Sequence, residues 1–334
     1  MATIRDVAEK AGVSTMTVSR VINNSGYVSD KTRAKIESVI EELGYIPNML
    51  GQSLRFNQTN TLALVITDIT NPFWTTVSRG VEDAAQEKGY SIILCNTDES
   101  VKKQDQYLTM LLKRRIDGIL LAPTSSSADG VHRITKLGIK VVVLDRDVPN
   151  VNVDIVLGDS FGGSVQLTKY LLELGHKHIA MVAGPRDVST STERVAGYEH
   201  AMQAAGLETG NGRIFWGKFS RASGYANAQK ALAQHPQPTA MFAANNFIAV
   251  GVLQAVREAG LRIPEDVSIV AFGDIPESIN PEPFFTVATH PTYEMGYQAT
   301  QILLSRIKEE GATQIQKIVL PIEIIPRGST ASPP

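Results

Sequence analysis

The stretch TIRDVAEKAGVSTMTVSRVINN, residues 3–24, decides the fold of the amino-terminal part of the chain. Its first half carries apolar residues at helical spacing, namely Ile4, Val7, Ala8 and Ala11, which form one stripe along a short helix. Gly12 then ends that helix, and Ser14 stands where the cap of a second helix belongs. Two short helices joined by a tight glycine-containing turn predict a helix-turn-helix.

The second helix of this motif places polar residues where they can reach DNA. Its apolar series is Met16 or Thr17, Val18, Val21 and Ile22. Off that stripe lie Thr15, Met16 and Arg20, and an arginine there can grip the O6 and N7 acceptors of guanine. Short donors suited to phosphate oxygens are Ser14, Thr17, Ser19, Asn23 and Asn24. On this stretch alone, a helical hairpin with a solvated face is the alternative.

A third helix is predicted to start at Ser29 and to end at Gly44. Its expected inner face consists of Ala34, Val39, Ile40 and Leu43. The following Tyr45-Ile46-Pro47-Asn48 favours an extended exit, because proline restricts the residue before it.

Length and composition indicate a soluble protein of two or three domains. The chain has 334 residues, 43% of them hydrophobic and 20% charged, and no apolar run approaches the roughly 18–20 residues of a membrane span. The single cysteine, Cys95, excludes an intramolecular disulfide, and with no signal-peptide core at the amino terminus we expect a cytoplasmic protein. The net charge is −2, and residues 1–59 carry seven Lys and Arg against six Asp and Glu. The DNA-binding hypothesis therefore rests on the motif and not on charge.

From Leu62 onward the pattern alternates between strands and helices. Four apolar runs predict fully buried parallel strands at 62–66, 91–95, 118–122 and 141–145, with helices such as 73–88 and 102–114 between them. After Asp159 the strands HIAMVAG, RIFWG, TAMFAAN and VSIVAFGD alternate with helices near 161–174, 193–205, 221–234 and 246–259. The break near Gly158-Asp159 predicts two similar doubly wound lobes.

Sequence motifs give an enzyme little support. The chain contains no G-x-G-x-x-G after a strand, no G-x-x-x-x-G-K-[ST] and no G-x-S-x-G, and its histidines do not pair at metal-ligand spacing. We therefore expect neither a cofactor nor a metal.

Polar and aromatic residues gather instead at the carboxyl ends of the predicted strands, where open α/β sheets bind ligands. They are Asp68, Asn71, Phe73, Trp74, Asp145, Arg146, Arg194, Phe219, Asn245, Asn246 and Asp274. Sugars present hydroxyl rims to Asp, Asn and Arg, and C–H faces to aromatic rings, so the set suits a sugar. Taken singly, these residues have structural alternatives: Asp68 and Asn71 would cap a helix, and Asp145-Arg146 would form a surface pair.

The segments TIRDVAEKAGVSTMTVSRVIN, VSDKTRAKI, LGYIPN and SLR together resemble the headpiece of the LacI/GalR family of bacterial transcription regulators. The resemblance implies that residues 48–60 form a hinge helix on DNA, with Leu54 wedged between base pairs in the minor groove. Gly51-Gln52 departs from the Ala-Arg that members often carry. Motif and resemblance together assign to DNA contact Thr3, Ser14, Thr15, Met16, Thr17, Ser19, Arg20, Asn23, Tyr45, Asn48 and Leu54.

The remainder resembles the two-lobed periplasmic sugar-binding proteins whose core this family shares. The matching positions imply a ribose-like effector held by Asn71, Phe73, Trp74, Asp145, Arg146, Arg194, Phe219, Asn245, Asp274 and His290. Three departures leave the sugar open: Asp274 falls one residue late, Asn246 replaces a frequent aspartate, and His290 replaces a glutamine. A histidine at that position would also suit a phosphorylated sugar.

The expected fold class is thus α/β, with an all-α headpiece and a periplasmic-binding-protein-like core of doubly wound parallel sheets. The expected boundaries are 1–47 for the headpiece, 48–60 for the hinge and 61–334 for the core. Within the core, one lobe would comprise 61–159 and 291–316, and the other 160–290 and 317–330.

The expected protein is a homodimeric regulator, a repressor in the family's usual sense, that binds a pseudo-palindromic operator and is controlled by a small sugar. Its dimer surface is expected on the outer helices 73–88 and 102–115. A sugar receptor without gene regulation and a nucleoside- or purine-responsive regulator are the alternatives.

Overall fold

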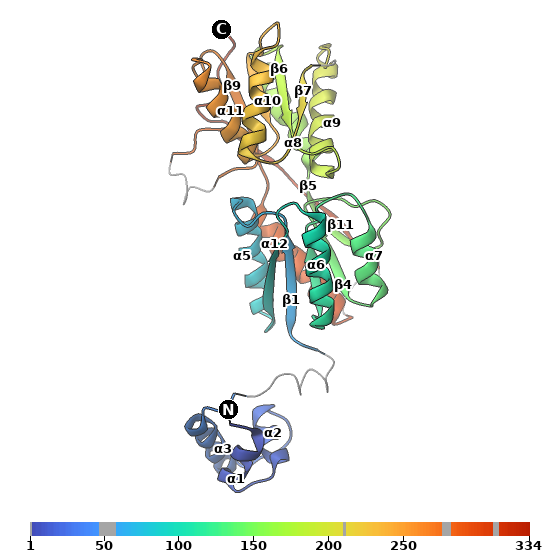
Figure 1. The fold of residues 1–334 in the computed structure, drawn as a ribbon, viewed down its shortest axis with the longest axis vertical. Coiled ribbons are helices and arrows are strands. Elements are labelled where there is room, and N and C mark those ends of the chain that lie inside the picture. Colours follow the sequence, from blue (N-terminus) through green and yellow to red (C-terminus); the bar gives the residue numbers. More distant parts are fainter. Residues whose placement is uncertain (1, 47–57, 210–211, 276–281, 310–313) are drawn as a thin grey trace. The chain divides into compact units, whose positions relative to one another are not determined.

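The computed structural model describes residues 2–46, 58–209, 212–275, 282–309 and 314–334. These fall into two compact units, Met1–Thr59 and Asn60–Pro334 (Figure 1). The predicted hinge helix, with Asn48, Leu54 and the Gly51-Gln52 departure, lies outside the described residues.

The first unit is a three-helix headpiece made of α1 (Ile4–Ala11), α2 (Thr15–Ile22) and α3 (Asp30–Leu43). Each helix starts at a hydroxyl cap, because Thr3, Ser14 and Ser29 accept hydrogen bonds from the backbone N–H three residues on. The helices enclose a small core of Val7, Ala8, Ala11, Val18, Val21, Ile36 and Val39. The predicted helix-turn-helix is therefore present.

One detail of the headpiece differs from the prediction, and one alternative that the sequence left open is decided. Ala34 is exposed and Ile36 is fully buried instead, because α3 turns the face containing residues 36, 39, 40 and 43 toward the other helices. Met16 is 65% exposed, so it belongs to the outer face of α2 and not to its apolar stripe.

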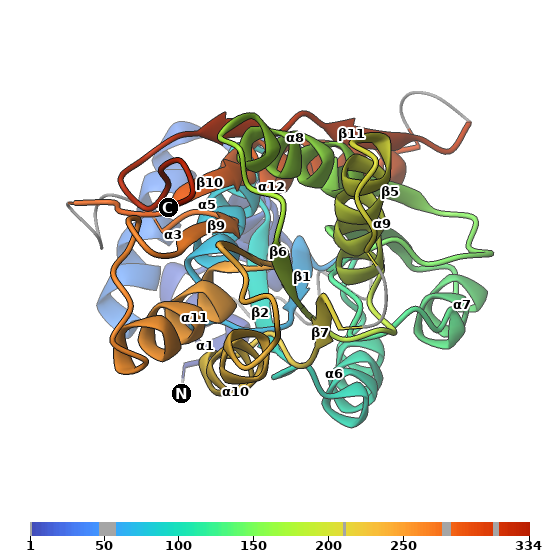
Figure 2. The ribbon, with the colours of Figure 1, turned by 90° about the horizontal axis from the view of Figure 1, so that it is seen from above.

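The second unit contains two six-stranded sheets, each covered by helices (Figures 1 and 2). The first sheet has the order β11-β5-β4-β3-β1-β2 and is parallel throughout. Its strands are β1 (Thr61–Ile66), β2 (Ser91–Asn96), β3 (Gly118–Leu121), β4 (Lys140–Leu144), β5 (Asp154–Gly158) and β11 (Lys317–Leu320). The helices of this first lobe are α5 (Pro72–Gln86), α6 (Val101–Lys113), α7 (Asp129–Lys136) and α12 (Thr292–Ile307).

The second sheet has the order β12-β10-β9-β8-β6-β7, and only β12 runs antiparallel to its neighbour. Its strands are β6 (Ile179–Ala183), β7 (Ile214–Trp216), β8 (Ala240–Ala243), β9 (Ser268–Phe272), β10 (Thr286–Thr289) and β12 (Glu323–Ile325). The helices of this second lobe are α8 (Ser160–Glu173), α9 (Ser189–Ala204), α10 (Arg221–Leu232) and α11 (Asn246–Glu258). The predicted α/β class with doubly wound sheets is confirmed.

The chain passes between the lobes three times, after β5, after β10 and after β11. The third crossing corrects the expected boundary at 316, because Lys317–Leu320 pair with Ile155–Gly158 in the first lobe's sheet (Figure 2). Backbone pairing thus places in the first lobe a segment that the expected boundaries had assigned to the second.

The expectation that residues 91–95 are fully buried is also wrong. Strand β2 is the edge of its sheet, and Leu94 is 40% exposed. The apolar run marked a strand correctly but did not distinguish an edge strand from a central one.

Candidate functional site

The outer face of α2 is the candidate DNA interface. Thr15, Met16 and Arg20 are exposed there, and Arg20 Nη2 lies 3.9 Å from Met16 Sδ, one helical turn away. No carboxylate of the described residues lies within ion-pair distance of Arg20. These three side chains form an exposed ridge on a helix whose width fits a major groove.

The other predicted DNA contacts also have roles inside the headpiece. Ser14 Oγ lies 2.9 Å from Thr17 Oγ1, and Asn23 Nδ2 donates to Ser19 Oγ at 3.0 Å. Thr3 forms a capping box with Asp6, and Tyr45 packs against the headpiece core. These bonds orient the side chains, and the hydroxyl and amide hydrogens that they do not use can donate to phosphate oxygens.

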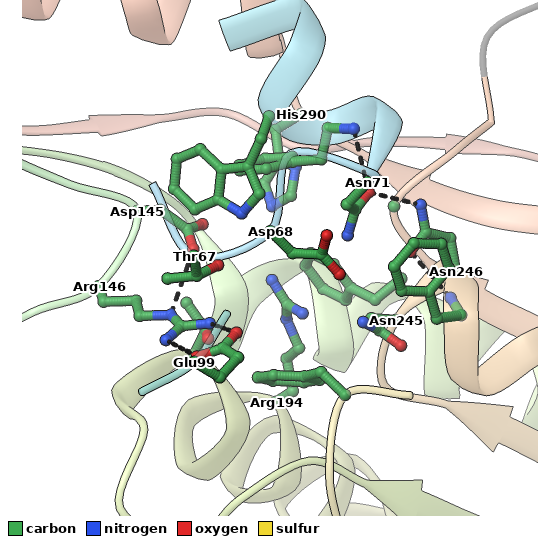
Figure 3. Close-up of a pocket in the computed structure, with 17 residues that line it drawn as sticks. Thr67, Asp68, Asn71, Glu99, Asp145, Arg146, Arg194, Asn245, Asn246 and His290 are labelled. Atoms are coloured by element: carbon green, nitrogen blue, oxygen red, sulfur yellow. Dashed lines mark hydrogen bonds and ion pairs between the residues drawn. The ribbon is translucent and has the colours of Figure 1, made fainter. Parts of the chain in front are cut away.

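The core has a cavity of about 570 Å³, its mouth included, at the carboxyl ends of strands from both lobes (Figure 3). Nine of the ten predicted effector residues line it, namely Asn71, Phe73, Trp74, Asp145, Arg146, Arg194, Phe219, Asn245 and His290. Strand-end placement therefore located the cavity from sequence.

Asp274 is the predicted residue that the structure does not bring into this cavity. Its carboxylate forms a two-pronged ion pair with Arg327, at 2.7 Å to Nη1 and 2.6 Å to Nη2. It lies in an adjoining groove, while its neighbour Gly273 lines the cavity. The shift of one residue noted in the sequence thus turns this carboxylate toward the carboxy-terminal segment.

The cavity has further lining residues that were not assigned to the effector site: Thr67, Asp68, Glu99, Thr190, Asn246, Phe247, Phe272 and Gly273. Several follow directly from the strand-end rule, since Thr67 comes after β1 and Phe272 ends β9. Thr190 is different, because it is the second residue of α9 and lies three residues before the predicted start of that helix.

Arg146 is a buried cation held by carboxylates. Glu99 accepts hydrogen bonds from both of its terminal nitrogens, at 2.7 Å from Nη1 and 2.6 Å from Nη2, and Asp145 lies 3.8 Å from Nε (Figure 3). Burial alone would lower the pKa of Arg146. The charge and hydrogen bonds of Glu99, together with the charge of Asp145, outweigh this effect, so the pKa lies above its ordinary value and the guanidinium stays charged. Burial also raises the pKa of Asp145, which the nearby arginines partly offset.

Arg194 reaches the cavity from α9. Its Nη1 donates to the carbonyl of Ala244 at 2.8 Å, and its guanidinium lies 3.9 Å from the ring centre of Phe272. Burial lowers its pKa to about 10, which still leaves it a cation at neutral pH. Its Nε has no hydrogen-bond partner among the described residues.

His290 lies at the second crossing between the lobes and is only 6% exposed. Its ring contacts Phe73 and Phe272, with ring centres 5.3 and 5.2 Å away. Burial, assisted by the charge of Arg194, lowers its pKa to about 3. The imidazole is therefore neutral at physiological pH, so it supplies no positive charge for a phosphorylated sugar.

The asparagines of the cavity combine two roles. Asn71 caps α5 by accepting from the backbone N–H of Phe73, and Asn245 caps α11 in the same way through Ile248. The structural alternative is thus correct for Asn71. The same Asn71 oxygen also accepts from Asn246 Nδ2 at 3.0 Å, which links the two lobes across the cavity.

An exposed recognition helix and a polar, aromatic cavity between two α/β lobes define a ligand-responsive DNA-binding regulator. Comparison with known proteins names the family. Residues 3–48 match the bacterial regulatory proteins of the lacI family, and residues 59–326 match the periplasmic binding proteins and sugar binding domain of the LacI family. The chain belongs to the LacI family and is a DNA-binding transcriptional regulator.

Similar proteins span the whole chain. The HTH-type transcriptional repressor PurR of Haemophilus influenzae is 37% identical over 335 residues, 99% of each chain. The ribose operon repressor of Escherichia coli is 37% identical over 331 residues, 98% of this chain and 100% of its own. A solved lac repressor dimer bound to operator and the anti-inducer ONPF has a TM-score of 0.86 at 26% identity, with 99% of both chains covered.

Within the described residues, no helix is both long and apolar enough to cross a membrane. Nor do His, Cys, Asp and Glu side chains there form a group of three that would hold a metal ion.

Proposed function

We propose that this regulator binds a pseudo-palindromic operator as a homodimer, and that a small neutral sugar in the core cavity controls its operator affinity. The observation that carries the proposal is the composition of the cavity. Carboxylate, amide and guanidinium groups alternate there with the flat rings of Phe73, Trp74, Phe219 and Phe272. Such a lining fits the hydroxyl rim and C–H faces of a sugar.

Charge favours a neutral ligand over a phosphorylated one. Both terminal nitrogens of Arg146 bind Glu99, and one terminal nitrogen of Arg194 binds a backbone carbonyl. His290 carries no charge near neutral pH, because its pKa is lowered to about 3. Among the relatives, a LacI family regulator from Enterococcus faecium solved with bound ribose supports a sugar, at 31% identity and a TM-score of 0.73 over 81% of this chain and 99% of its own.

Closure of the lobes is the proposed link between the cavity and DNA. Besides the pair Asn246–Asn71, the lobes contact each other through Asp147 N–H, which donates to Ser189 Oγ at 2.8 Å, and Ser126 N–H, which donates to the carbonyl of Asp187 at 3.1 Å. A ligand that touches both lobes strengthens the closed arrangement. The resulting coupling free energy is typically 1–3 kcal/mol and acts reciprocally on sugar and operator.

The dimer surface is proposed on the first lobe. Leu94 on the edge strand β2 and Val101 at the start of α6 are 40% and 50% exposed. The expected helix 102–115 corresponds to α6 and would contribute to this surface, whereas α5 already packs against α12. The lac repressor neighbour is a dimer on its operator, which supports a twofold arrangement here.

A purine or nucleoside is the second candidate for the effector. Five Phe and Trp side chains in one cavity also suit a flat heterocycle, and the relative from Haemophilus influenzae is named PurR. The relatives are transcriptional regulators, so we assign the protein no catalytic step. We place it in the cytoplasm, because a bacterial regulator acts on operators of the chromosome.

Thermal unfolding of the full-length chain separates the effector classes. The compounds are D-ribose and other pentoses, hexoses, sugar phosphates, nucleosides and purine bases, since a ligand that binds only the folded state raises Tm. We expect the largest shift with a neutral sugar, and a nucleoside or purine as the sole stabilising compound would overturn the sugar assignment. Gel shifts with genomic fragments at low salt, with and without the stabilising compound, then test the regulatory part, which fails if no fragment binds.

A further inference from the structure

We propose that Glu99 sets the charge class of the effector: by covering the terminal nitrogens of Arg146, it makes the cavity prefer neutral ligands to anionic ones. The proposal rests on the proposed function, in which the cavity holds the effector, and adds the residue that decides between a sugar and its phosphate.

Geometry gives the first argument. An arginine binds phosphate or carboxylate by presenting two parallel N–H groups along one edge of its fork. In Arg146 the edge formed by Nη1 and Nη2 is occupied by the two oxygens of Glu99, at 2.7 and 2.6 Å. Nη1 also donates to the carbonyl of Pro123 at 3.0 Å, and Asp145 lies 3.8 Å from Nε. Carboxylates therefore stand beside both edges on which an incoming anion would bind.

The backbone that carries Glu99 gives the second argument. Asp98 and Glu99 adopt φ values of +49° and +55°, a left-handed conformation that side chains disfavour. The loop is held by the N–H of Glu99, which donates to the carbonyl of Thr67 at 3.1 Å, and by Asn96 Nδ2, which donates to Asp98 Oδ1 at 2.7 Å. Strained backbone persists where the surrounding structure imposes it, and it concentrates at functional sites.

The charge balance of the cavity gives the third argument. Its carboxylates are Asp68, Glu99 and Asp145, and its cations are Arg146 and Arg194. His290 is neutral and burial raises the pKa of Asp145, so the carboxylates of the lining at least balance its two guanidinium groups. Neutralising Glu99 would remove one negative charge from the lining and release the edge of Arg146, so this one side chain controls both the charge of the cavity and the access to Arg146.

A purely structural role for Glu99 predicts something different. Arg146 is only 5% exposed, so a carboxylate partner is needed merely to compensate a buried charge. In that case replacing Glu99 lowers stability and weakens all ligands alike. A role in selecting charge instead changes the ratio between anionic and neutral ligands.

The test compares full-length Glu99→Gln with wild type and with Glu82→Gln, a matched change on the exposed surface of the same lobe. The probes are D-ribose, D-ribose 5-phosphate and inorganic phosphate, measured by thermal shift and calorimetric titration. In Glu99→Gln we expect the ratio of the two sugar Kd values to move at least tenfold toward the phosphate, and inorganic phosphate to raise Tm. Glu82→Gln and the charge-conserving Glu99→Asp should keep the wild-type preference.

An unchanged ratio in Glu99→Gln, an equal change in Glu82→Gln, or a wild type that already prefers the sugar phosphate overturns the assignment of Glu99. Glu99→Ser, which also uncovers the Arg146 edge, provides the same measurement if the glutamine variant is not recovered. A wild type that binds no neutral sugar contradicts the proposed effector class. In that event, a phosphate response gained by Glu99→Gln and not by Glu82→Gln still supports the role of Glu99.

Discussion

The ring of His290 lies directly against Gly158, so closely that a Cβ built on the glycine would overlap it. Gly158 ends β5 just before the first crossing between the lobes, and His290 lies at the second crossing. The two crossings are therefore packed against each other beside the effector cavity. A change at either residue therefore acts on the crossings, where the proposed closure of the lobes would require the chain to bend.

Gly158→Ala should destabilise the core by about 1–3 kcal/mol, because the added methyl group displaces the imidazole or the backbone of the crossing. Chemical unfolding of the full-length chain measures the loss. The double variant Gly158→Ala with His290→Ala should regain part of it, since the smaller side chain makes room. Strictly additive losses in the two single variants would show that this contact is not the cause.

Arg20→Ala should weaken operator binding at least tenfold and leave effector affinity unchanged. Arg20 is exposed on α2, and a two-pronged contact between arginine and a base is worth about 1–3 kcal/mol. The measurement is fluorescence anisotropy with an operator selected from a random library by the wild-type protein. Arg257→Ala, an exposed arginine of α11, is the matched control, and equal losses in both variants would contradict the prediction.

Arg194→Ala should lower sugar affinity at least tenfold and retain operator binding, because hydrogen bonds from a buried charged group contribute about 1.5–3 kcal/mol. Titration calorimetry and gel shifts measure the two functions separately. Arg186→Ala is the control, since Arg186 also stacks on an aromatic ring, 4.4 Å from the ring centre of Trp216, but lies outside the cavity lining. If the effector is a co-repressor that strengthens operator binding, Arg194→Ala should retain the operator affinity measured without effector and lose the increase that the effector causes.

Acid should destabilise the wild type more than His290→Gln. The pKa of His290 falls from 6.5 in the unfolded chain to about 3 in the folded one, so the unfolded chain takes up the proton first. Stability is thus complete above about pH 6.5 and declines as the pH drops toward 3, by about 2 kcal/mol at pH 5. Urea unfolding of both proteins at pH 7.5 and pH 5 measures the difference.

The comparison isolates His290 because His176, whose pKa is also lowered by burial, is present in both proteins. Parallel pH dependence in wild type and His290→Gln would show that the imidazole is not protonated on unfolding in this range.

Local sequence signals predicted most of the elements. The caps Ser14 and Ser29 and the terminating Gly12 and Gly44 lie where the pattern placed them, because capping depends on residues within one turn. Helix α12 was not predicted. Its inward face packs against α5 and the first sheet and carries Met295, Ala299 and Leu303 four residues apart, so apolar periodicity marks this helix as well.

Sequence alone determined that the chain starts with a helix-turn-helix, continues as two α/β lobes and presents polar and aromatic residues at strand ends. These properties follow from apolar periodicity and capping, which act over a few residues. Only the tertiary structure decided that β11 joins the first lobe, that Asp274 turns to Arg327, and that Glu99 covers Arg146. Each of these depends on groups 47 or more residues apart, and their pairing is set by the burial and charge balance of the folded core.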